Sequence, residues 1–238
     1  MRELSDVSTV SDDPLVLWVA QGMSPGVRAW ANRGTVAVAC PDLSCRDRLV
    51  IHGDAGDAVP LLNHALAEIG PTFRPIGDVD LIAEVTEVVE DLEFVSAFGW
   101  MDTDVPPPVE PDAAEWLDDA DDRDVAALLE SAMPDSYAWP GRPGVKRWAG
   151  RRDDGGNLIA TAADAWSAPE VGFISGVATD ITVRGHGHAT ATCAVVIGDL
   201  VRRHGQAAVM VDDWNTPAIA VYEHLGMRRR HLAAARFA

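Results

Sequence analysis

The chain has 238 residues, 47% of them hydrophobic and 24% charged, with a formal net charge of −18. Such a chain can bury a substantial core in one large or two small domains. The acidic excess argues against a nucleic-acid partner, because nucleic-acid-binding proteins neutralise phosphates with Lys and Arg. It favours the approach of a cation such as a protonated amine, or it serves solubility alone. No apolar run approaches the ~20 residues that cross a bilayer, and the first residues lack a signal-peptide pattern, so we expect a cytoplasmic protein without a membrane partner.

The cysteines and acidic residues do not suggest a metal centre. Cys40, Cys45 and Cys193 are too few for a disulfide framework. Cys40 and Cys45 are five residues apart and lack the second Cys or His pair of a zinc site. The acidic run over residues 118–124 has no nearby His or Cys, so it indicates a solvated turn with helix caps. We therefore expect no metal.

The first half of the chain predicts alternating strands and helices. Residues 15–20 are apolar all round, which fits either a buried helix or a buried strand. The elements expected after them are paired strands over 27–31 and 35–40, a strand over 48–52, a helix over 57–69, a strand over 72–76, a helix over 79–89 and a strand over 92–101.

A proline-rich segment, residues 105–111, predicts an extended linker between a first domain (1–104) and a second domain (112–238). The second domain is expected to begin with short helices over 112–120 and 121–133 and a loop over 134–144. A hairpin of strands over 145–151 and 158–166 follows, and then a strand over 171–179.

Two motifs follow that strand. In the first, the turn Val183–Ala189 leads into a helix with an apolar stripe, and glycines at 185 and 187 let an anion approach the free N–H groups of the helix start. A plain tight turn is the alternative interpretation. In the second, a strand over 207–211 leads through Asn215 and Pro217 into a helix that carries Ala218, Tyr222 and Leu225 on one stripe and ends at Gly226.

Together these two motifs resemble the GNAT superfamily of acyl-CoA-dependent N-acetyltransferases over roughly residues 112–238. In that superfamily Arg/Gln-x-x-Gly-x-Gly/Ala binds pyrophosphate, and an Asn…Ala…Tyr…Leu-Gly pattern marks the next helix. The resemblance implies an α/β fold with a mixed α+β sheet and acetyl transfer from acetyl-CoA to a primary amine by direct attack. The matching residues are Arg184, Gly187, Ala189, Asn215, Ala218, Tyr222, Leu225 and Gly226.

The resemblance also implies which residues would hold acetyl-CoA. Backbone N–H groups of Val177, Ala178 and Thr179 would polarise the thioester carbonyl. Asn215 would bond the pantetheine, or it would serve only as a helix cap. The pyrophosphate would lie against Arg184, Gly185, His186, Gly187, His188, Ala189 and Thr190, with the Arg184 side chain free to serve structure instead.

Catalytic and acceptor residues are expected by the same resemblance. Tyr222 would be the general acid that protonates the leaving thiolate, against the alternative of an aromatic on a core stripe. Glu170 would be the general base, with Asp180, Asp213 and a water chain as competitors. Asp135, Tyr137 and Trp139 would contact the acceptor, unless the aromatics only pin their loop to the core.

The first half repeats the strand–helix order of the second, which predicts a tandem arrangement with a degenerate GNAT-like first half. Its turn, residues 53–57, has two acidic residues and no arginine, so it would repel pyrophosphate. An unrelated α/β domain is the alternative. A non-catalytic acyl-CoA-binding or regulatory module also fits, whereas a Rossmann-type nucleotide-binding protein would need its glycine turn after the first strand. The acceptor and the oligomeric state, a monomer of two pseudo-repeated halves or a homodimer, stay open.

Overall fold

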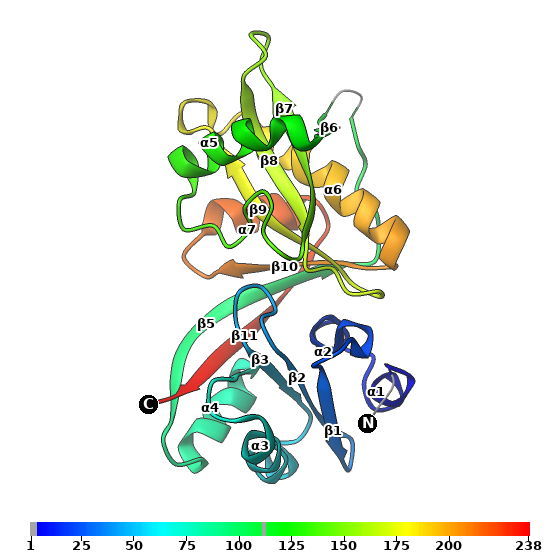
Figure 1. Cartoon of the computed structure of the whole chain (residues 1–238), viewed down its shortest axis with the longest axis vertical. Coiled ribbons are helices and arrows are strands. Elements are labelled where there is room, and N and C mark those ends of the chain that lie inside the picture. Colours follow the sequence, from blue (N-terminus) through cyan, green and yellow to red (C-terminus); the bar gives the residue numbers. More distant parts are fainter. Residues whose placement is uncertain (1–3, 111–112) are drawn as a thin grey trace.

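The computed structural model describes residues 4–110 and 113–238, and it has two halves stacked end to end (Figure 1). Its strands form one eleven-stranded sheet in the order β1-β2-β3-β4-β11-β5-β10-β9-β8-β7-β6. The strands are β1 (Arg28–Asn32), β2 (Thr35–Cys40), β3 (Arg48–His52), β4 (Arg74–Asp78), β5 (Leu92–Thr103), β6 (Glu115–Trp116), β7 (Val145–Arg152), β8 (Leu158–Ala165), β9 (Gly172–Thr179), β10 (Ala207–Asp212) and β11 (Arg228–Phe237). A mixed α/β fold is thus confirmed.

Seven α-helices and three short 3₁₀ helices lie among the described residues. The α-helices are α1 (Leu4–Val10), α2 (Pro14–Ala20), α3 (Ala55–Ile69), α4 (Val79–Val88), α5 (Asp122–Ala132), α6 (His188–His204) and α7 (Thr216–His224). The 3₁₀ helices are η1 (Gln21–Met23), η2 (Asp119–Asp121) and η3 (Ile181–Val183). None of the described helices is both long and apolar enough to cross a membrane.

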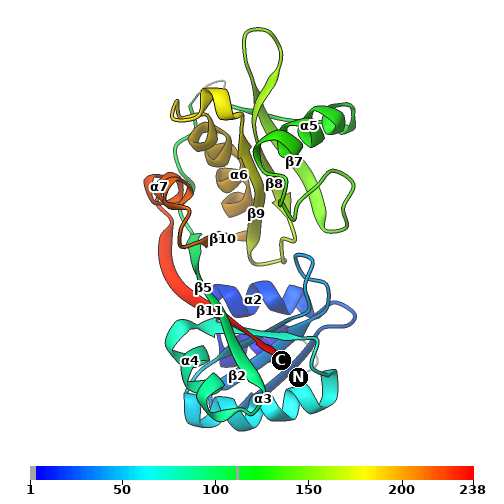
Figure 2. The same cartoon turned by 90° about the vertical axis from the view of Figure 1, so that its left-hand side faces the viewer.

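Apart from β6 at one edge, the strand order reads alike from both ends of the sheet. Strands β1 to β4 are followed by β11, and strands β7 to β10 are followed by β5. The last strand of each half therefore lies beside the other half, and β5 and β11 pair with each other antiparallel at the centre, where they cross between the halves (Figures 1 and 2). This is the arrangement that a duplicated domain exchanging its last strand would have. The duplication and the domain limits stay predictions.

One expectation about secondary structure was wrong, and one strand was missed. The helix expected over 112–120 is not formed: β6 pairs with β7, and Asp118 instead accepts a hydrogen bond from the Ala120 N–H at 2.8 Å. Short acidic side chains favour such local caps over a continuing helix. Pro111 and Asp112 lie outside the described residues. Strand β11 was not expected, because it begins with three arginines and a histidine and continues with alanines, a weak strand pattern.

Side chains of β2 and β3 alternate between two layers of the first half. Val36 and Val38 face α2, whereas Ala37 and Ala39 face α3 and α4 on the opposite side of the sheet. Figure 2 shows α2 on one side of these strands and α3 on the other. Both faces are therefore buried, which is why these strands are apolar without interruption.

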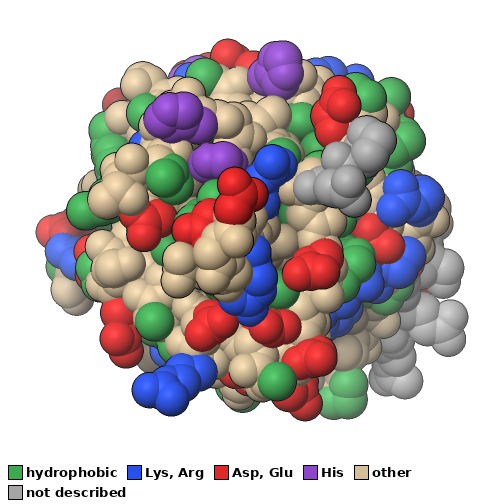
Figure 3. Space-filling model, turned by 90° about the horizontal axis from the view of Figure 1, so that it is seen from above, with side chains coloured by type: hydrophobic (Ala, Val, Ile, Leu, Met, Phe, Trp, Pro, Cys, Tyr) green, Lys and Arg blue, Asp and Glu red, His purple; other side chains and the backbone are tan. Residues whose placement is uncertain are grey.

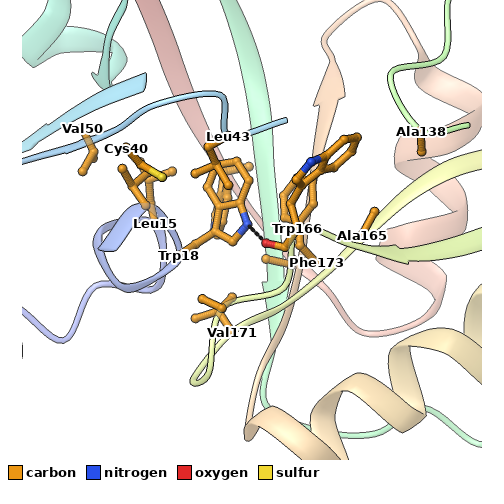
Figure 4. Packing of buried hydrophobic residues seen from close by; sticks show 14 of the residues in the cluster. Leu15, Trp18, Cys40, Leu43, Val50, Ala138, Ala165, Trp166, Val171 and Phe173 are labelled. Carbon is orange, nitrogen blue, oxygen red and sulfur yellow. Dashed lines mark hydrogen bonds between the residues drawn. The ribbon is translucent and has the colours of Figure 1, made fainter. Parts of the chain in front are cut away.

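An aromatic cluster joins the two halves. Trp18 of α2 packs against Trp100 of β5 and Phe173 of β9, with ring centroids 5.7 Å and 4.4 Å away respectively. The indole Nε1 of Trp18 donates a hydrogen bond to the Trp166 carbonyl at 2.9 Å (Figure 4). The core therefore runs without a break from α2 to the strands of the second half.

Candidate functional site

Strands β9 and β10 run parallel but are paired only where they begin. Gly172 pairs with Ala207 and Phe173 with Ala208, and no further pair joins the two strands. We call the region between residues 175–179 of β9 and residues 209–212 of β10 the fork. Edge N–H and C=O groups that face the fork have no neighbouring strand, so they are available to a ligand.

A β-bulge lies on the β9 side of the fork. Ser175 pairs with Ala163 and Ala178 with Thr161, so Gly176 and Val177 together stand opposite a single residue of β8. Gly176 has φ +61°, and a Cβ there would lie 2.5 Å from the Trp148 ring. Only glycine fits this position. The bulge interrupts the regular ladder beside Val177, where the carbonyl-polarising N–H group is predicted.

The turn after β9 ends at the free N-terminus of α6. Gly185 and Gly187 have φ +81° and +80°, and a Cβ at either position would meet nothing within 4 Å. Gly187 is the N-cap, and no side chain caps the helix. The first N–H groups of this 17-residue helix, those of His188, Ala189 and Thr190, therefore have no side-chain cap, and together with the positive end of the helix dipole they suit a phosphate.

The corresponding helix of the first half, α3, has the opposite character. Asp54 is its N-cap, and its carboxylate accepts a hydrogen bond from the Gly56 N–H at 2.9 Å. Asp57 adds a second negative charge to the first turn. The anion position of α3 is thus filled by the chain's own carboxylate, so that of these two helices only α6 begins without one.

Side chains of the α6 turn hold its shape. Arg184 donates from Nε to the Thr179 carbonyl at 3.2 Å and from Nη2 to the Ala132 carbonyl at 3.1 Å, so it ties the turn to α5. The rings of His186 and His188 stack with centroids 6.2 Å apart. Partial burial, and then the charge of Arg151, lower the pKa of His188 below 6.5, so this ring is neutral at pH 7.

The end of the second half is polar. Figure 3 shows acidic, basic and histidine side chains interspersed on this face, with hydrophobic side chains scattered among them. No apolar patch extends over the surface in this view. A polar ligand suits such a face better than an apolar partner does.

Tyr222 lies in the core that α6, β10 and α7 share. It is 4% exposed and packs in the same hydrophobic cluster as Cys193 and Leu225. Burial, and then the proximity of Cys193, raise the pKa of the phenol well above 10, so the group keeps its proton at neutral pH. Cys193 itself is fully buried, and burial raises the pKa of its thiol to about 12.

Asn215 begins α7. Its side-chain oxygen accepts a hydrogen bond from the Ala218 N–H at 3.3 Å, and Pro217 stands in the first turn. The cap interpretation of Asn215 therefore fits the structure, and its amide N–H₂ group is left for a ligand.

The structure does not bring Glu170 together with the fork. Glu170 precedes β9 at the end where β9 and β10 are paired, and a strand rise of about 3.3 Å per residue puts it roughly 20 Å from Val177. Its Oε2 is buried without a partner among the described residues. The competing carboxylates are engaged elsewhere, Asp180 with the Thr182 N–H at 2.8 Å and Asp213 with Arg229 at 2.6 Å.

The loop over 134–144 touches β9 at the bulge. A Cβ at Gly176 would lie 3.2 Å from the Cβ of Ala138, which places this loop against the fork strand. Trp139 is half-buried and donates from Nε1 to the Ser136 carbonyl at 2.7 Å, so it pins the loop. Asp135 is exposed, and Tyr137 is 39% exposed. We call residues 134–144 the acceptor loop, after the acceptor contacts expected there from the sequence.

Sequence reasoning missed a contribution of the first half to this loop. Arg46, in the β2–β3 connection, donates from Nε to the Tyr137 hydroxyl at 3.1 Å. No local sequence pattern predicts a contact between residues 91 positions apart.

Within the described ranges, no group of three or more His, Cys, Asp or Glu side chains is placed to hold a metal ion.

Comparisons with known proteins agree with this fold. Residues 154–236 match a family described as FR47-like protein. No curated protein matches the chain in sequence. Among solved structures, the chain is similar to a GCN5-related N-acetyltransferase from Kribbella flavida (19% identity, 91% of each chain, TM-score 0.59). It is also similar to an acetyltransferase from the GNAT family from Colwellia psychrerythraea (13% identity, 100% of this chain and 98% of that one, TM-score 0.58). A tandem GNAT protein from the clavulanic acid biosynthesis pathway is a third (13% identity, 96% and 89%, TM-score 0.50).

Proposed function

Since the chain has the fold of the GNAT superfamily, as its sequence motifs predict, we propose that it is an acetyl-CoA-dependent N-acetyltransferase. The observation that carries this proposal is the fork between β9 and β10, which leads directly to the uncapped N-terminus of α6. A strand edge with free N–H groups suits a thioester carbonyl, and a helix start without a carboxylate suits a pyrophosphate. Acyl transfer in general fits this fold; acetyl-CoA as donor and an amine as acceptor are the proposal.

In the proposed reaction the amine nitrogen attacks the thioester carbonyl carbon, the C–S bond breaks, and the products are an amide and the free thiol of coenzyme A. Backbone N–H groups of Val177 to Thr179 stabilise the negative charge that develops on the carbonyl oxygen. Tyr222 gives its proton to the leaving sulfur, because its raised pKa keeps it protonated until that step. Gly185 to Thr190 hold the pyrophosphate, and Asn215 bonds the pantetheine.

Removal of the amine proton is assigned to a water chain or to a carboxylate. Glu170 was our first expectation, and its position near the paired end of β9 makes a direct role there difficult. A water chain in the fork would deliver the proton without a carboxylate beside the acceptor. We propose a small-molecule or peptide amine as the acceptor, within the cytoplasm, with no nucleic-acid or membrane partner.

One observation favours the non-catalytic alternative, an acyl-CoA-binding or regulatory module. Each carboxylate that we considered as a base is engaged by another residue or distant from the fork. Such a module would bind acetyl-CoA in the same place without turning it over.

An assay of acetyl-CoA-dependent thiol release against a panel of amines separates the two functions, with mass spectrometry to find the acetylated amine. The proposal predicts thiol release that depends on the amine and that Tyr222→Phe suppresses without weakening acetyl-CoA binding. Binding of acetyl-CoA with no thiol release for any amine would favour the module. Absence of acetyl-CoA binding would contradict both.

A further inference from the structure

Four arginines that lie together lack an acidic partner. Arg46, Arg48, Arg74 and Arg142 have no Asp or Glu oxygen within 4.0 Å among the described residues. Most other arginines of the chain pair with a carboxylate, and the chain has 37 acidic residues for 19 basic ones. Unpaired arginines that gather in so acidic a protein therefore need an explanation.

Two of them, Arg46 and Arg142, converge on the acceptor loop. Arg46 donates from Nε to the Tyr137 hydroxyl, and its guanidinium carbon lies 5.3 Å from the centre of the Tyr137 ring. Arg142 donates from Nη1 to the Tyr137 carbonyl at 2.8 Å and lies 3.1 Å from the Cys45 sulfur. Neutral partners thus hold both guanidinium groups in place, and their positive charge is not compensated.

The other two, Arg48 and Arg74, add positive charge close to Arg46. Arg48 is 7% exposed and donates from Nε to the Leu43 carbonyl at 2.9 Å. Burial lowers the pKa of Arg48 to about 10. Burial, and then the charge of Arg46, lower the pKa of Arg74 as well. Like charges held this close repel one another, so an anion bound among them would be stabilised.

Nearby carboxylates do not neutralise the group. Asp42 and Asp47 lie on the same β2–β3 connection, and Asp47 accepts a hydrogen bond from the Asp42 backbone N–H at 3.0 Å. Neither carboxylate reaches within 4.0 Å of Arg46 or Arg142 among the described ion pairs. An external anion is therefore not excluded by a competing side chain.

The arginines stand next to the proposed acyl-transfer site. Ala138 follows Tyr137 in the chain and packs against Gly176 of the β9 bulge. One side of the acceptor loop therefore contacts the fork strand, and the residue before it carries Arg46 and Arg142. A molecule whose amine reaches the fork can place a second group, a short distance away, against these arginines.

We propose that Arg46 of the first half and Arg142 of the acceptor loop bind an anionic group, a carboxylate or a phosphate, on the acceptor amine. The planar guanidinium group suits either anion, because carboxylates and phosphates both accept paired hydrogen bonds from it. This inference rests on the proposed function, and it assigns the first half a share in acceptor recognition. The overall charge of −18 is compatible with it: the long-range field attracts the amine, and the local arginines bind the anionic end.

Alkylation of Cys45 measures anion binding without any turnover. Cys45 is exposed, whereas Cys40 and Cys193 are buried, so a neutral reagent such as iodoacetamide reports on this position, read by peptide mass spectrometry. We expect succinate or inorganic phosphate to slow the alkylation of the wild type, and the stronger of the two identifies the preferred anion. Because Arg142 touches Cys45, each variant is compared with itself, with and without the anion.

Arg46→Gln and Arg142→Gln should each need about ten times more anion for half-protection, because each removes a charge-assisted hydrogen bond. Arg142→Lys should restore part of the protection. Arg33→Gln is the matched control, since Arg33 is 81% exposed and belongs to the β1–β2 turn. No protection of the wild type by either anion would overturn the proposal. Protection by acetyl-CoA that depends on Arg46 and Arg142 would assign the arginines to the cofactor and would overturn it too.

A second measurement separates this inference from the proposed function. Amino acids and their α-amides are compared as acceptors in the thiol-release assay, because each pair differs only in the anionic group. A preference for the acid that Arg46→Gln abolishes supports the inference. Equal turnover of acid and amide would contradict the inference and leave the proposed N-acetyl transfer intact. Failure to bind acetyl-CoA would contradict the proposed function, and the alkylation experiment would then show by itself whether Arg46 and Arg142 bind an anion.

Discussion

Trp18 of the first half stacks on Phe173 of β9, with ring centroids 4.4 Å apart and ring planes 21° apart (Figure 4). Phe173 is one of the two residues at which β9 still pairs with β10, so this stack supports the strand where the fork begins. The first half thus stabilises the proposed acyl-transfer strand, although its own helix start at Asp54 repels an anion.

Trp18→Ala should lower the free energy of unfolding by about 3–5 kcal/mol, because it removes a fully buried indole and leaves a cavity between the halves. Urea denaturation followed by circular dichroism measures the change. Trp214→Ala is the control, since Trp214 is 78% exposed and should cost little. Equal losses for the two variants would contradict the role given to Trp18.

Asp13→Asn should destabilise the protein at neutral pH. Asp13 caps α2 and pairs with Arg230 of β11, so the change leaves the half-buried Arg230 with Asp78 as its remaining ion-pair partner among the described residues, at a cost of about 2 kcal/mol. Burial raises the pKa of Asp13, but the hydrogen bond and charge of Arg230 outweigh burial and lower it below 3.8.

The effect of Asp13→Asn should depend on pH. A carboxyl whose pKa is lower in the folded state stabilises the protein above its unfolded pKa and loses that contribution as pH falls through its folded pKa. The difference between wild type and variant should therefore be constant from neutral pH to about 4 and shrink below it. Urea midpoints measured across this range provide the test, and an unchanged difference at the acid end would contradict the ion pair.

Tyr222→Phe should lower kcat roughly 100-fold or more while the affinity for acetyl-CoA stays within a factor of about two. The raised pKa of the phenol means that the wild-type rate should not fall on the alkaline side until above pH 10. Steady-state rates against pH for both proteins measure this. The wild-type rate could instead fall at alkaline pH with an apparent pKa well below 10, while the rate of the variant does not. That result would exclude Tyr222 as the acid in its present environment.

Local patterns in the sequence predicted most of the elements and the α6 turn. Gly185 and Gly187 lie in the turn that opens α6, as expected, and Asn215 begins α7 as expected. These features depend on neighbours within a few residues, which a sequence displays directly.

Long-range features escaped prediction for physical reasons. β11 lies between β4 and β5. Its arginines and alanines do not give the alternating apolar pattern of a strand, and its composition does not indicate a partner in the other half. The contact of Arg46 with Tyr137 joins residues far apart in the chain. Glu170 was chosen from its place before β9, but β9 pairs with β10 at Gly172 and Phe173, so the fork lies at the other end of the strand.

The central claim, that the α6 N-terminus holds the pyrophosphate of acetyl-CoA, is tested most directly by calorimetric titration of acetyl-CoA into three proteins: wild type, Gly187→Asp and Gly187→Asn. Asp and Asn have nearly the same shape, and both tolerate a positive φ better than most residues do, so the pair isolates the charge. The aspartate would reproduce the carboxylate that Asp54 places at α3. We predict binding by the wild type, a modest loss for Gly187→Asn, and a further loss of about tenfold or more for Gly187→Asp. Equal affinities of the two variants, or no binding by the wild type, would contradict the claim.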